Sequence, residues 1–300
     1  MRKAVIFFIL GLTCLIPTLH SYDLVIVALC KNEGPYLDEW LHYHLLAGVE
    51  HFYLYDNGSL DNTLEVLAPY IEKGIVDLTI WPSATDDPNH VNAQIQAYKD
   101  GLKRAVGIAT WVALIDLDEY ILPIQHQTIT ECLNKNFKDV DAIYVNWRNF
   151  GTSYLTIPPG EPILNKMVLS SSMYHPRNVV GKSIVRPEKV DIDQIWYVHH
   201  CVLKRGAVYR DGNKKVMDSK NCDLKTDGLH HKDHLVIHHY GLRDEWYFHN
   251  IRKARFFKRF GSIDLLLEHY DAFNLTYNPQ MLKYLKEKHP TEYDRYWGSR

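Results

Sequence analysis

The chain has 300 residues, of which 46% are hydrophobic and 23% charged, an ordinary balance for a soluble globular protein. This composition excludes collagen, a mainly disordered chain and a multi-span membrane protein. Lys and Arg number 34 against 36 acidic residues, so the net charge at pH 7 is −2. Because no overall positive charge is available to hold a phosphate backbone, we expect no nucleic-acid partner.

The N-terminal segment carries an export signature. Arg2 and Lys3 precede an uncharged run over residues 4–16. That run is shorter than the roughly 20 residues of a spanning helix and is typical of a signal-peptide core. Residues 1–21 are therefore predicted to be a signal peptide that directs export. The segment before Tyr22 lacks the small residues of a good cleavage site, so retention of residues 4–16 as a membrane anchor is the alternative.

From residue 22 onwards, strand-like and helix-like segments alternate. Continuous apolar runs predict strands, and apolar stripes at helical spacing predict helices. The expected strands are 24–29, 51–55, 75–81, 110–115 and 141–147, with helices at 35–47, 60–73 and 92–106. This alternation predicts an α/β protein with a mostly parallel, doubly wound sheet. Ligands of such sheets bind outside the carboxyl ends of the strands.

The regular alternation ends near residue 150. Beyond it we expect strands at 182–190, 196–208 and 235–240, a polar loop at 211–233, a basic aromatic helix at 243–260 and two short helices. The economical interpretation is one domain, 22–300, with a C-terminal helical elaboration. Residues 22–125 are expected to form its nucleotide-binding half and residues 126–300 its acceptor half.

The strongest chemical signal is the pair Asp116 and Asp118, directly after an apolar strand. Residues i and i+2 of an extended chain point to the same side, so we expect the two carboxylates to converge while Leu117 enters the core. Two carboxylates suit Mn²⁺ or Mg²⁺ and leave coordination positions for phosphate oxygens. A bare Asp-x-Asp is also common in solvated acidic loops, but its place at a strand end favours a metal site.

Two further polar clusters follow strands. Lys31, Asn32 and Glu33 come after the first strand, and Asp56 comes after the second. Groups at these positions can bind a base or a ribose. Each cluster also has a purely structural alternative, because Asn32 and Glu33 could cap the next helix and Asp56 could hold a turn.

Together the motifs resemble glycosyltransferase family 92. The resemblance covers about residues 24–255 and rests on the order and spacing of the segments 29–63, 114–120 (LIDLDEY), 147–153 (WRNFGTS), 182–190 (KSIVRPEKV) and 237–246 (IHHYGLRDEW). It implies the GT-A fold, a Rossmann-like nucleotide-sugar-binding α/β fold related to that of family 2. Tyr120 stands where the family usually has Phe.

The resemblance also implies an activity and a set of site residues. The expected reaction is metal-dependent transfer of a hexose, galactose from UDP-galactose, to a glycan or glycoconjugate acceptor with inversion. The residues expected around the nucleotide-sugar are Lys31, Asn32, Glu33, Asp56 and Asp116. The metal, Mn²⁺ or Mg²⁺, would be held by Asp116, Asp118 and His239.

Alternatives remain open at this point. A metal-dependent hydrolase could use the same acidic and histidine residues, and a non-catalytic nucleotide- or carbohydrate-binding module could descend from such an enzyme. The retained pair Asp116 and Asp118 argues against the module. No pattern selects the catalytic base, for which the candidates are Glu161, Glu188, Asp191 and Asp193.

The remaining histidines and cysteines give weaker signals. The zinc motif HExxH is absent, so among the clustered histidines only His239, and after it His199, are site candidates. If the chain is exported, Cys201 and Cys222 are the favoured disulfide pair, and free buried thiols are the alternative.

Overall fold

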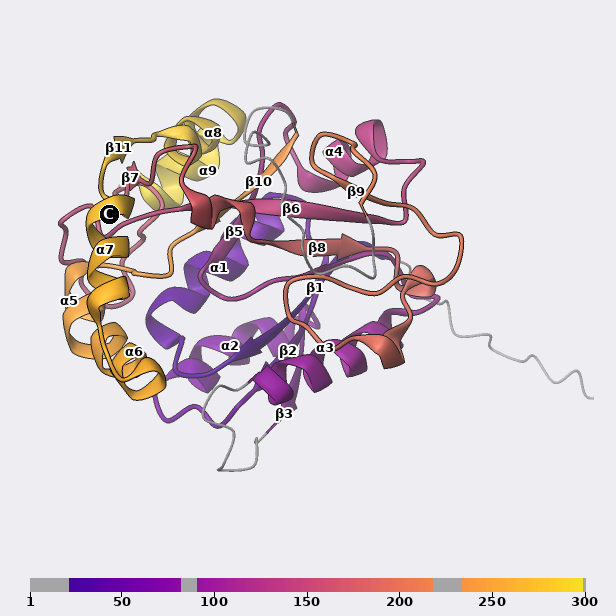
Figure 1. Cartoon of the computed structure of the whole chain (residues 1–300), viewed down its shortest axis with the longest axis horizontal. Coiled ribbons are helices and arrows are strands. Elements are labelled where there is room, and N and C mark those ends of the chain that lie inside the picture. Colours follow the sequence, from indigo (N-terminus) through magenta and orange to yellow (C-terminus); the bar gives the residue numbers. More distant parts are fainter. Residues whose placement is uncertain (1–21, 82–90, 218–233, 299–300) are drawn as a thin grey trace, which may run out of the picture.

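A computed structural model describes residues 22–81, 91–217 and 234–298. Its centre is a nine-stranded sheet in the order β3-β2-β1-β4-β8-β6-β10-β5, with β9 also paired to β6 (Figure 1). The strands of this sheet are β1 (Tyr22–Cys30), β2 (His51–Asp56), β3 (Val76–Ile80), β4 (Ala109–Leu114), β5 (Glu119–Pro123), β6 (Ala142–Asn149), β8 (Gly181–Val185), β9 (Tyr209–Asp211) and β10 (Leu235–His239). A separate pair joins β7 (Leu169–Ser170) to β11 (Thr276–Tyr277).

The first half is the predicted parallel α/β unit. β1 pairs in parallel with β2 and β4, and β2 pairs in parallel with β3. Leu24 and Ile26 pack toward α1 (Gly34–Leu46) and α2 (Thr63–Glu72), whereas Val25 and Val27 pack toward α3 (Val91–Ala105). The continuous apolar run of β1 therefore reflects burial on both faces, as expected for a central parallel strand.

The second half makes the sheet mixed. β8 is antiparallel to both β4 and β6, and β10 runs parallel to β6 but antiparallel to β5. The sequence did not predict β5 or the helix α4 (Ile129–Asn136), because both follow the acidic motif closely and are short. β5 matters for the site, since its pairing with β10 places Glu119 opposite His239.

Two predicted strands were wrong in extent or kind. The strand expected at 182–190 ends at Val185, and a 3₁₀ turn begins at Pro187, which cannot donate to a ladder. Residues 196–208 form no strand and contribute only an isolated bridge between Val190 and Leu203. Their apolar side chains, such as Cys201 and Leu203, pack against the α3 side of the sheet. The apolar pattern thus indicated burial rather than pairing.

The C-terminal helices gather along one side of the molecule, drawn in orange and yellow in Figure 1. The helix expected at 243–260 consists of α5 (Glu245–Tyr247), a π-helical turn (Phe248–Arg252) and α6 (Lys253–Phe260). More than the expected two helices follow: α7 (Asp264–Phe273), α8 (Gln280–Lys288), α9 (Pro290–Glu292) and a π-helical turn (Tyr293–Trp297).

Cys30, Cys132 and Cys201 are buried free thiols. Cys222, the expected partner of Cys201, and the predicted export segment 1–21 lie outside the described residues. No helix in the described ranges has the length and apolar character needed to cross a membrane.

Candidate functional site

The acidic motif after β4 forms a turn rather than the expected extended chain. The amide of Glu119 donates to the carbonyl of Asp116 over 3.2 Å, and β5 begins at once. The two aspartates therefore contact different partners, which corrects the convergence that the i, i+2 spacing predicted. Asp116 faces Lys182, and Asp118 faces His239. Leu117 enters the core as expected, with 3% of its surface exposed.

His239 and Asp118 face each other across the end of the sheet, although the sequence separates them widely. The Nε2 atom of His239 lies 3.6 Å from Oδ2 of Asp118. The Nδ1 atom of His239 lies 2.8 Å from Oδ1 of Asn149, whose amide nitrogen donates to Asn178. Because the amide of Asn149 is oriented in this way, Nδ1 carries the proton in the neutral ring and Nε2 presents a lone pair to the carboxylate. Two electron-pair donors that face each other form a suitable place for a cation.

Glu119 completes this group, and sequence reasoning missed it. Asp118, Glu119 and His239 each offer a ligand atom, and the three atoms lie within 4.8 Å of one another. Oε2 of Glu119 accepts the amide of Asp116, while its buried Oε1 has no hydrogen-bond partner. Burial, with Asp116 and Asp118 nearby, raises the pKa of Glu119 well above its usual range, even though Lys182 opposes this. The signal that could have found Glu119 was its place directly after the Asp-x-Asp.

The space beside these ligand atoms is kept open by Gly241. A Cβ at this position would stand 2.8 Å from Nε2 of His239 and 3.6 Å from Oδ2 of Asp118. Two carboxylates and one imidazole suit Mn²⁺, and Mg²⁺ less well because it prefers oxygen ligands. The residues present therefore fit a divalent metal at this point.

Asp116 lies at the same turn but outside that group. Its Oδ1 accepts from Nζ of Lys182 over 3.0 Å and from the hydroxyl of Tyr98 over 3.3 Å, and it also contacts Gln94. Lys182 is fully buried, and although burial alone would lower its pKa, Asp116 and Tyr98 raise it well above its usual range. The ammonium therefore stays charged and orients the carboxylate of Asp116.

The loop after β1 is joined to the loop after β2. Asn32 has a φ of 56°, its amide donates to Oγ of Ser59, and its Oδ1 accepts the amide of Leu60. Asp56 is 2% exposed and accepts from the amides of Gly58 and Ser59. These contacts match the structural role considered for Asp56 in the sequence, in which its carboxylate stabilises the turn after β2.

Glu33 forms an ion pair with a distant segment of the chain. Its Oε2 accepts from Nη2 of Arg243 over 2.7 Å. Burial raises the pKa of Glu33 to about 7, with Arg243 acting in the opposite direction. The side chain thus ties the end of β1 to the segment after β10.

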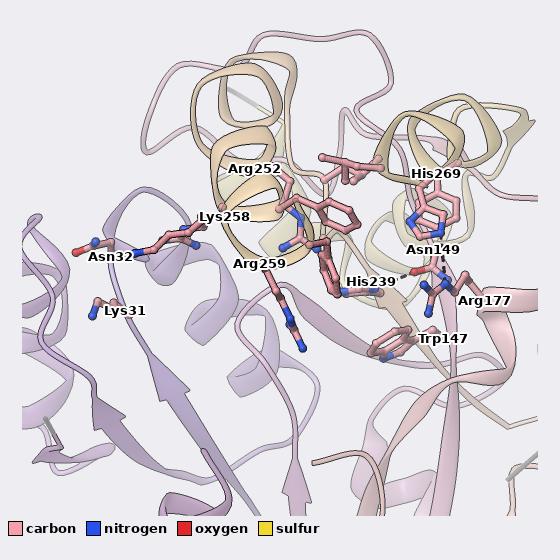
Figure 2. A pocket seen from close by; sticks show the side chains of 17 residues that line it. Lys31, Asn32, Trp147, Asn149, Arg177, His239, Arg252, Lys258, Arg259 and His269 are labelled. Atoms are coloured by element: carbon pink, nitrogen blue, oxygen red, sulfur yellow. Dashed lines mark hydrogen bonds between the residues drawn. The ribbon is translucent and has the colours of Figure 1, made fainter. Parts of the chain in front are cut away.

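A cavity of about 830 Å³ opens beside these groups (Figure 2). Lys31 and Asn32 lie at one end, Trp147, Arg177 and His269 lie at the other, and His239 lies between them. Glu33 and Asp56 are not among its lining residues. The lining consists of Lys31, Asn32, Trp147, Asn149, Arg177, His239, Gly241, Leu242, Arg252, Arg255, Phe256, Lys258, Arg259, Phe260, Leu266, His269 and Phe273.

The candidate bases from the sequence do not line this cavity. Glu161 pairs with Lys166, and Glu188 accepts the amide of Gly107. Asp191 precedes the 3₁₀ turn Ile192–Gln194 and Asp193 lies within it. Nζ of Lys99, on α3, donates to the carbonyl of Asp193, and neither aspartate lines the cavity. His199 packs edge-on against Trp147, and its Nδ1 is bonded to the carbonyl of Gly181. Burial lowers the pKa of His199 to about 3, so this imidazole is neutral.

Several solved structures resemble the chain at low sequence identity. Staphylococcus aureus TarS 1-349 matches at 12% identity with a TM-score of 0.41, over 91% of this chain and 74% of that one. The same TarS fragment in complex with UDP-GlcNAc matches at 15% identity with a TM-score of 0.39, over 66% and 60% of the two chains. The mannosyltransferase PcManGT from Pyrobaculum calidifontis, in complex with GDP-Man and Mn²⁺, matches at 16% identity with a TM-score of 0.32, over 43% and 36%.

Curated sequences match more closely. Glycosyltransferase family 92 protein RCOM_0530710 of Ricinus communis is 30% identical over 200 residues, which cover 65% of this chain and 34% of that protein. Glycosyltransferase family 92 protein At1g27200 of Arabidopsis thaliana is 25% identical over 198 residues, which cover 62% and 32%. The match thus spans about a third of the length of these relatives. The model of glycosyltransferase family 92 matches residues 32–264. The chain therefore belongs to glycosyltransferase family 92.

Proposed function

We propose that this protein is a metal-dependent glycosyltransferase that transfers a hexose, galactose from UDP-galactose, to a glycan or glycoconjugate acceptor with inversion. The observation that carries the proposal is the group of Asp118, Glu119 and His239 beside an open glycine. His239 and Gly241 line a cavity that also includes Lys31 and Asn32, directly after β1. Membership of the family supports glycosyl transfer as the reaction class. The choice of galactose as the donor sugar, and of inversion as the stereochemistry, rests on the resemblance to the family.

The cavity suggests how the donor would lie. The uridine would occupy the end formed by Lys31 and Asn32, because ligands of parallel sheets bind at the carboxyl ends of the strands. The diphosphate would then extend toward His239, where Mn²⁺ or Mg²⁺ would neutralise its charge. Asp118, Glu119 and Nε2 of His239 would hold that ion, and Asn149 would keep the imidazole in the correct tautomer.

The transfer step follows from this placement. An acceptor hydroxyl oxygen attacks the anomeric carbon on the side opposite the diphosphate, while the bond from that carbon to the phosphate oxygen breaks. The electron pair of that bond leaves on UDP, and the hydroxyl proton passes to a general base or to water as the new glycosidic bond forms. Arg252 and Arg259, which line the cavity, add positive charge where the leaving group gains negative charge.

We also propose that the protein is exported, with residues 1–21 as its signal or residues 4–16 as its anchor. This rests on the sequence of that segment alone.

The test is a screen of UDP-sugars for UDP release by the purified protein, with Mn²⁺, with Mg²⁺ and with chelator. We expect release from UDP-galactose that needs metal and an acceptor, and a product of inverted anomeric configuration by NMR. Cleavage of simple esters or phosphodiesters without nucleotide-sugar would indicate the hydrolase instead. Tight UDP binding with no turnover of any donor would indicate a binding module.

A further inference from the structure

The cavity is lined by more Lys and Arg side chains than are needed to balance the negative charge of the donor's diphosphate. Of the described residues that line it, six are Lys or Arg and none is Asp or Glu. They are Lys31, Arg177, Arg252, Arg255, Lys258 and Arg259. The diphosphate of a nucleotide-sugar carries about two negative charges, and Asp118 and Glu119 would balance a divalent metal beside it, so two of the six cations would offset the donor. The cavity therefore offers a surplus of cations for a second anionic group.

The cations are not spread evenly relative to the expected donor. Lys258 lies toward Lys31, and Arg252 and Arg259 project from the helical segment above the middle of the cavity (Figure 2). Arg177 lies beyond His239, at the end opposite Lys31. A donor that runs from Lys31 to His239 leaves Arg177 on the acceptor side.

Arg177 is held in place at that end. It belongs to the 3₁₀ turn Pro176–Val179, which Asn178 anchors because its buried Oδ1 accepts the amide of Asn149 and the hydroxyl of Ser171. The Nε atom of Arg177 donates to Nε2 of His269 over 3.3 Å. The ring of His269 is in turn stacked on Phe273.

The surroundings of Arg177 leave its charge uncompensated. Burial, with Arg177 and His175 nearby, lowers the pKa of His269 to about 4, so His269 accepts as a neutral ring at pH 7. Among the described residues no carboxylate forms an ion pair with Arg177. Its guanidinium, with Nε already bonded, still has both terminal nitrogens to offer to a planar or tetrahedral oxyanion.

We propose that the acceptor is an anionic glycan, and that Arg177 binds its carboxylate, sulfate or phosphate group. This rests on the proposed function, because it assumes that the donor fills the end of the cavity formed by Lys31 and Asn32. Trp147 lines the same end of the cavity as Arg177 and would border the accepting sugar. An aromatic side chain beside an arginine is a suitable surface for a charged saccharide.

The experiment compares matched acceptors with UDP-galactose and Mn²⁺. The set is a neutral hexoside, the uronate of the same sugar, and the sulfate and phosphate esters of the neutral hexoside. We expect at least one charged acceptor to have a KM at least tenfold below that of the neutral one, with the advantage shrinking as salt rises. The three charged arms identify which oxyanion is recognised. Equal KM values for neutral and charged acceptors would overturn the proposal.

Variants assign the effect to Arg177. Arg177→Gln should raise the KM for the charged acceptor at least tenfold and leave the KM for the neutral acceptor and the Kd for UDP unchanged. Arg177→Lys should restore part of the loss, because it keeps the charge without the forked geometry. The matched control is Arg205→Gln, since Arg205 is an exposed arginine outside the cavity. A weaker Kd for UDP in Arg177→Gln would place this residue on the donor and contradict the proposal.

Failure of the proposed function gives a different result. In that case no UDP-sugar releases UDP with any acceptor, whatever its charge. Calorimetric titration with the charged saccharides then tests Arg177 alone. Binding that Arg177→Gln abolishes supports the anion site, and the absence of such binding overturns it.

Discussion

Arg243 joins the two loops that border the candidate site, because its Nη2 lies 2.7 Å from Oε2 of Glu33, 210 residues away in the sequence. The same nitrogen donates to the carbonyl of Leu117, and the guanidinium covers the ring of Tyr36 at 4.1 Å. Arg243 is 1% exposed and has a φ of 54°. One buried side chain thus connects the end of β1, the acidic turn and the segment after β10.

The first prediction concerns the stability that this connection provides. Arg243→Met should lower the free energy of unfolding at pH 8 by about 3–5 kcal/mol, because it leaves the carboxylate of Glu33 buried without its partner. Chemical denaturation of both proteins measures the loss. Arg243→Met combined with Glu33→Gln should lose clearly less than the two single variants added together. Additive losses would mean that the ion pair is not what couples the loops.

The second prediction concerns the acidic turn. Asp118→Asn should lower transfer at least a hundredfold and weaken Mn²⁺ binding, because one ligand oxygen and one negative charge are lost. The melting temperature without metal should change little, since the carboxylate is partly exposed. Mn²⁺ titration followed by electron paramagnetic resonance gives the affinity directly. Unchanged affinity in Asp118→Asn would remove this residue from the metal site.

The third prediction uses the open space at Gly241. Gly241→Ala should reduce Mn²⁺ affinity at least tenfold, because the added methyl group would stand 2.8 Å from Nε2 of His239. The control is Gly206→Ala, where a Cβ meets nothing within 4 Å, although its φ of 86° adds backbone strain. That control should lose some stability and retain its Mn²⁺ affinity. Equal affinities in both variants would place the ion elsewhere.

The fourth prediction separates two adjacent histidines. His239→Ala should raise the Mn²⁺ concentration needed for half-maximal transfer, because Nε2 is lost as a ligand. His238 points to the other side of β10, is fully buried and packs against Phe150 at 4.5 Å between ring centroids. His238→Ala should therefore lower stability and leave the metal requirement unchanged. Matching shifts in the metal requirement would contradict the assignment of His239.

The fifth prediction concerns pH and lies away from the site. Burial lowers the pKa of His44 to about 3. Its Nδ1 lies 2.9 Å from the carbonyl of Trp40, and its Nε2 accepts the amide of Ile121, which together define a neutral ring. Below pH 6.5 the unfolded chain binds a proton that the folded chain does not, so stability falls as pH falls from 6.5 toward 3.

The size of that effect can be measured by difference. Between pH 7 and pH 5, His44 should account for about 2 kcal/mol of lost stability. His44→Asn should be less stable at pH 7 and should lose about 2 kcal/mol less than the parent over this interval, by urea unfolding at both pH values. An identical pH dependence in the two proteins would show that His44 titrates normally in the folded state.

The sequence alone was enough to predict the first half of the fold. β1 and β4 are largely apolar runs, and alternate residues of β1 are buried against opposite faces of the sheet. This pattern predicted the parallel α/β unit. It also predicted that the acidic motif emerges at the carboxyl end of a strand, here β4. The family followed from the order and spacing of the motifs.

Only the tertiary structure decided which residues meet. The turn at Asp116–Glu119 separates two carboxylates that an extended chain would have placed together, because a backbone hydrogen bond closes over them. Glu119 and His239 become neighbours because β5 pairs with β10. No local sequence pattern predicts a short strand directly after a turn. Arg177 reaches the far end of the cavity from a 3₁₀ turn anchored by Asn178. Local sequence determines burial and turn chemistry, whereas contacts between distant segments depend on how the whole sheet packs.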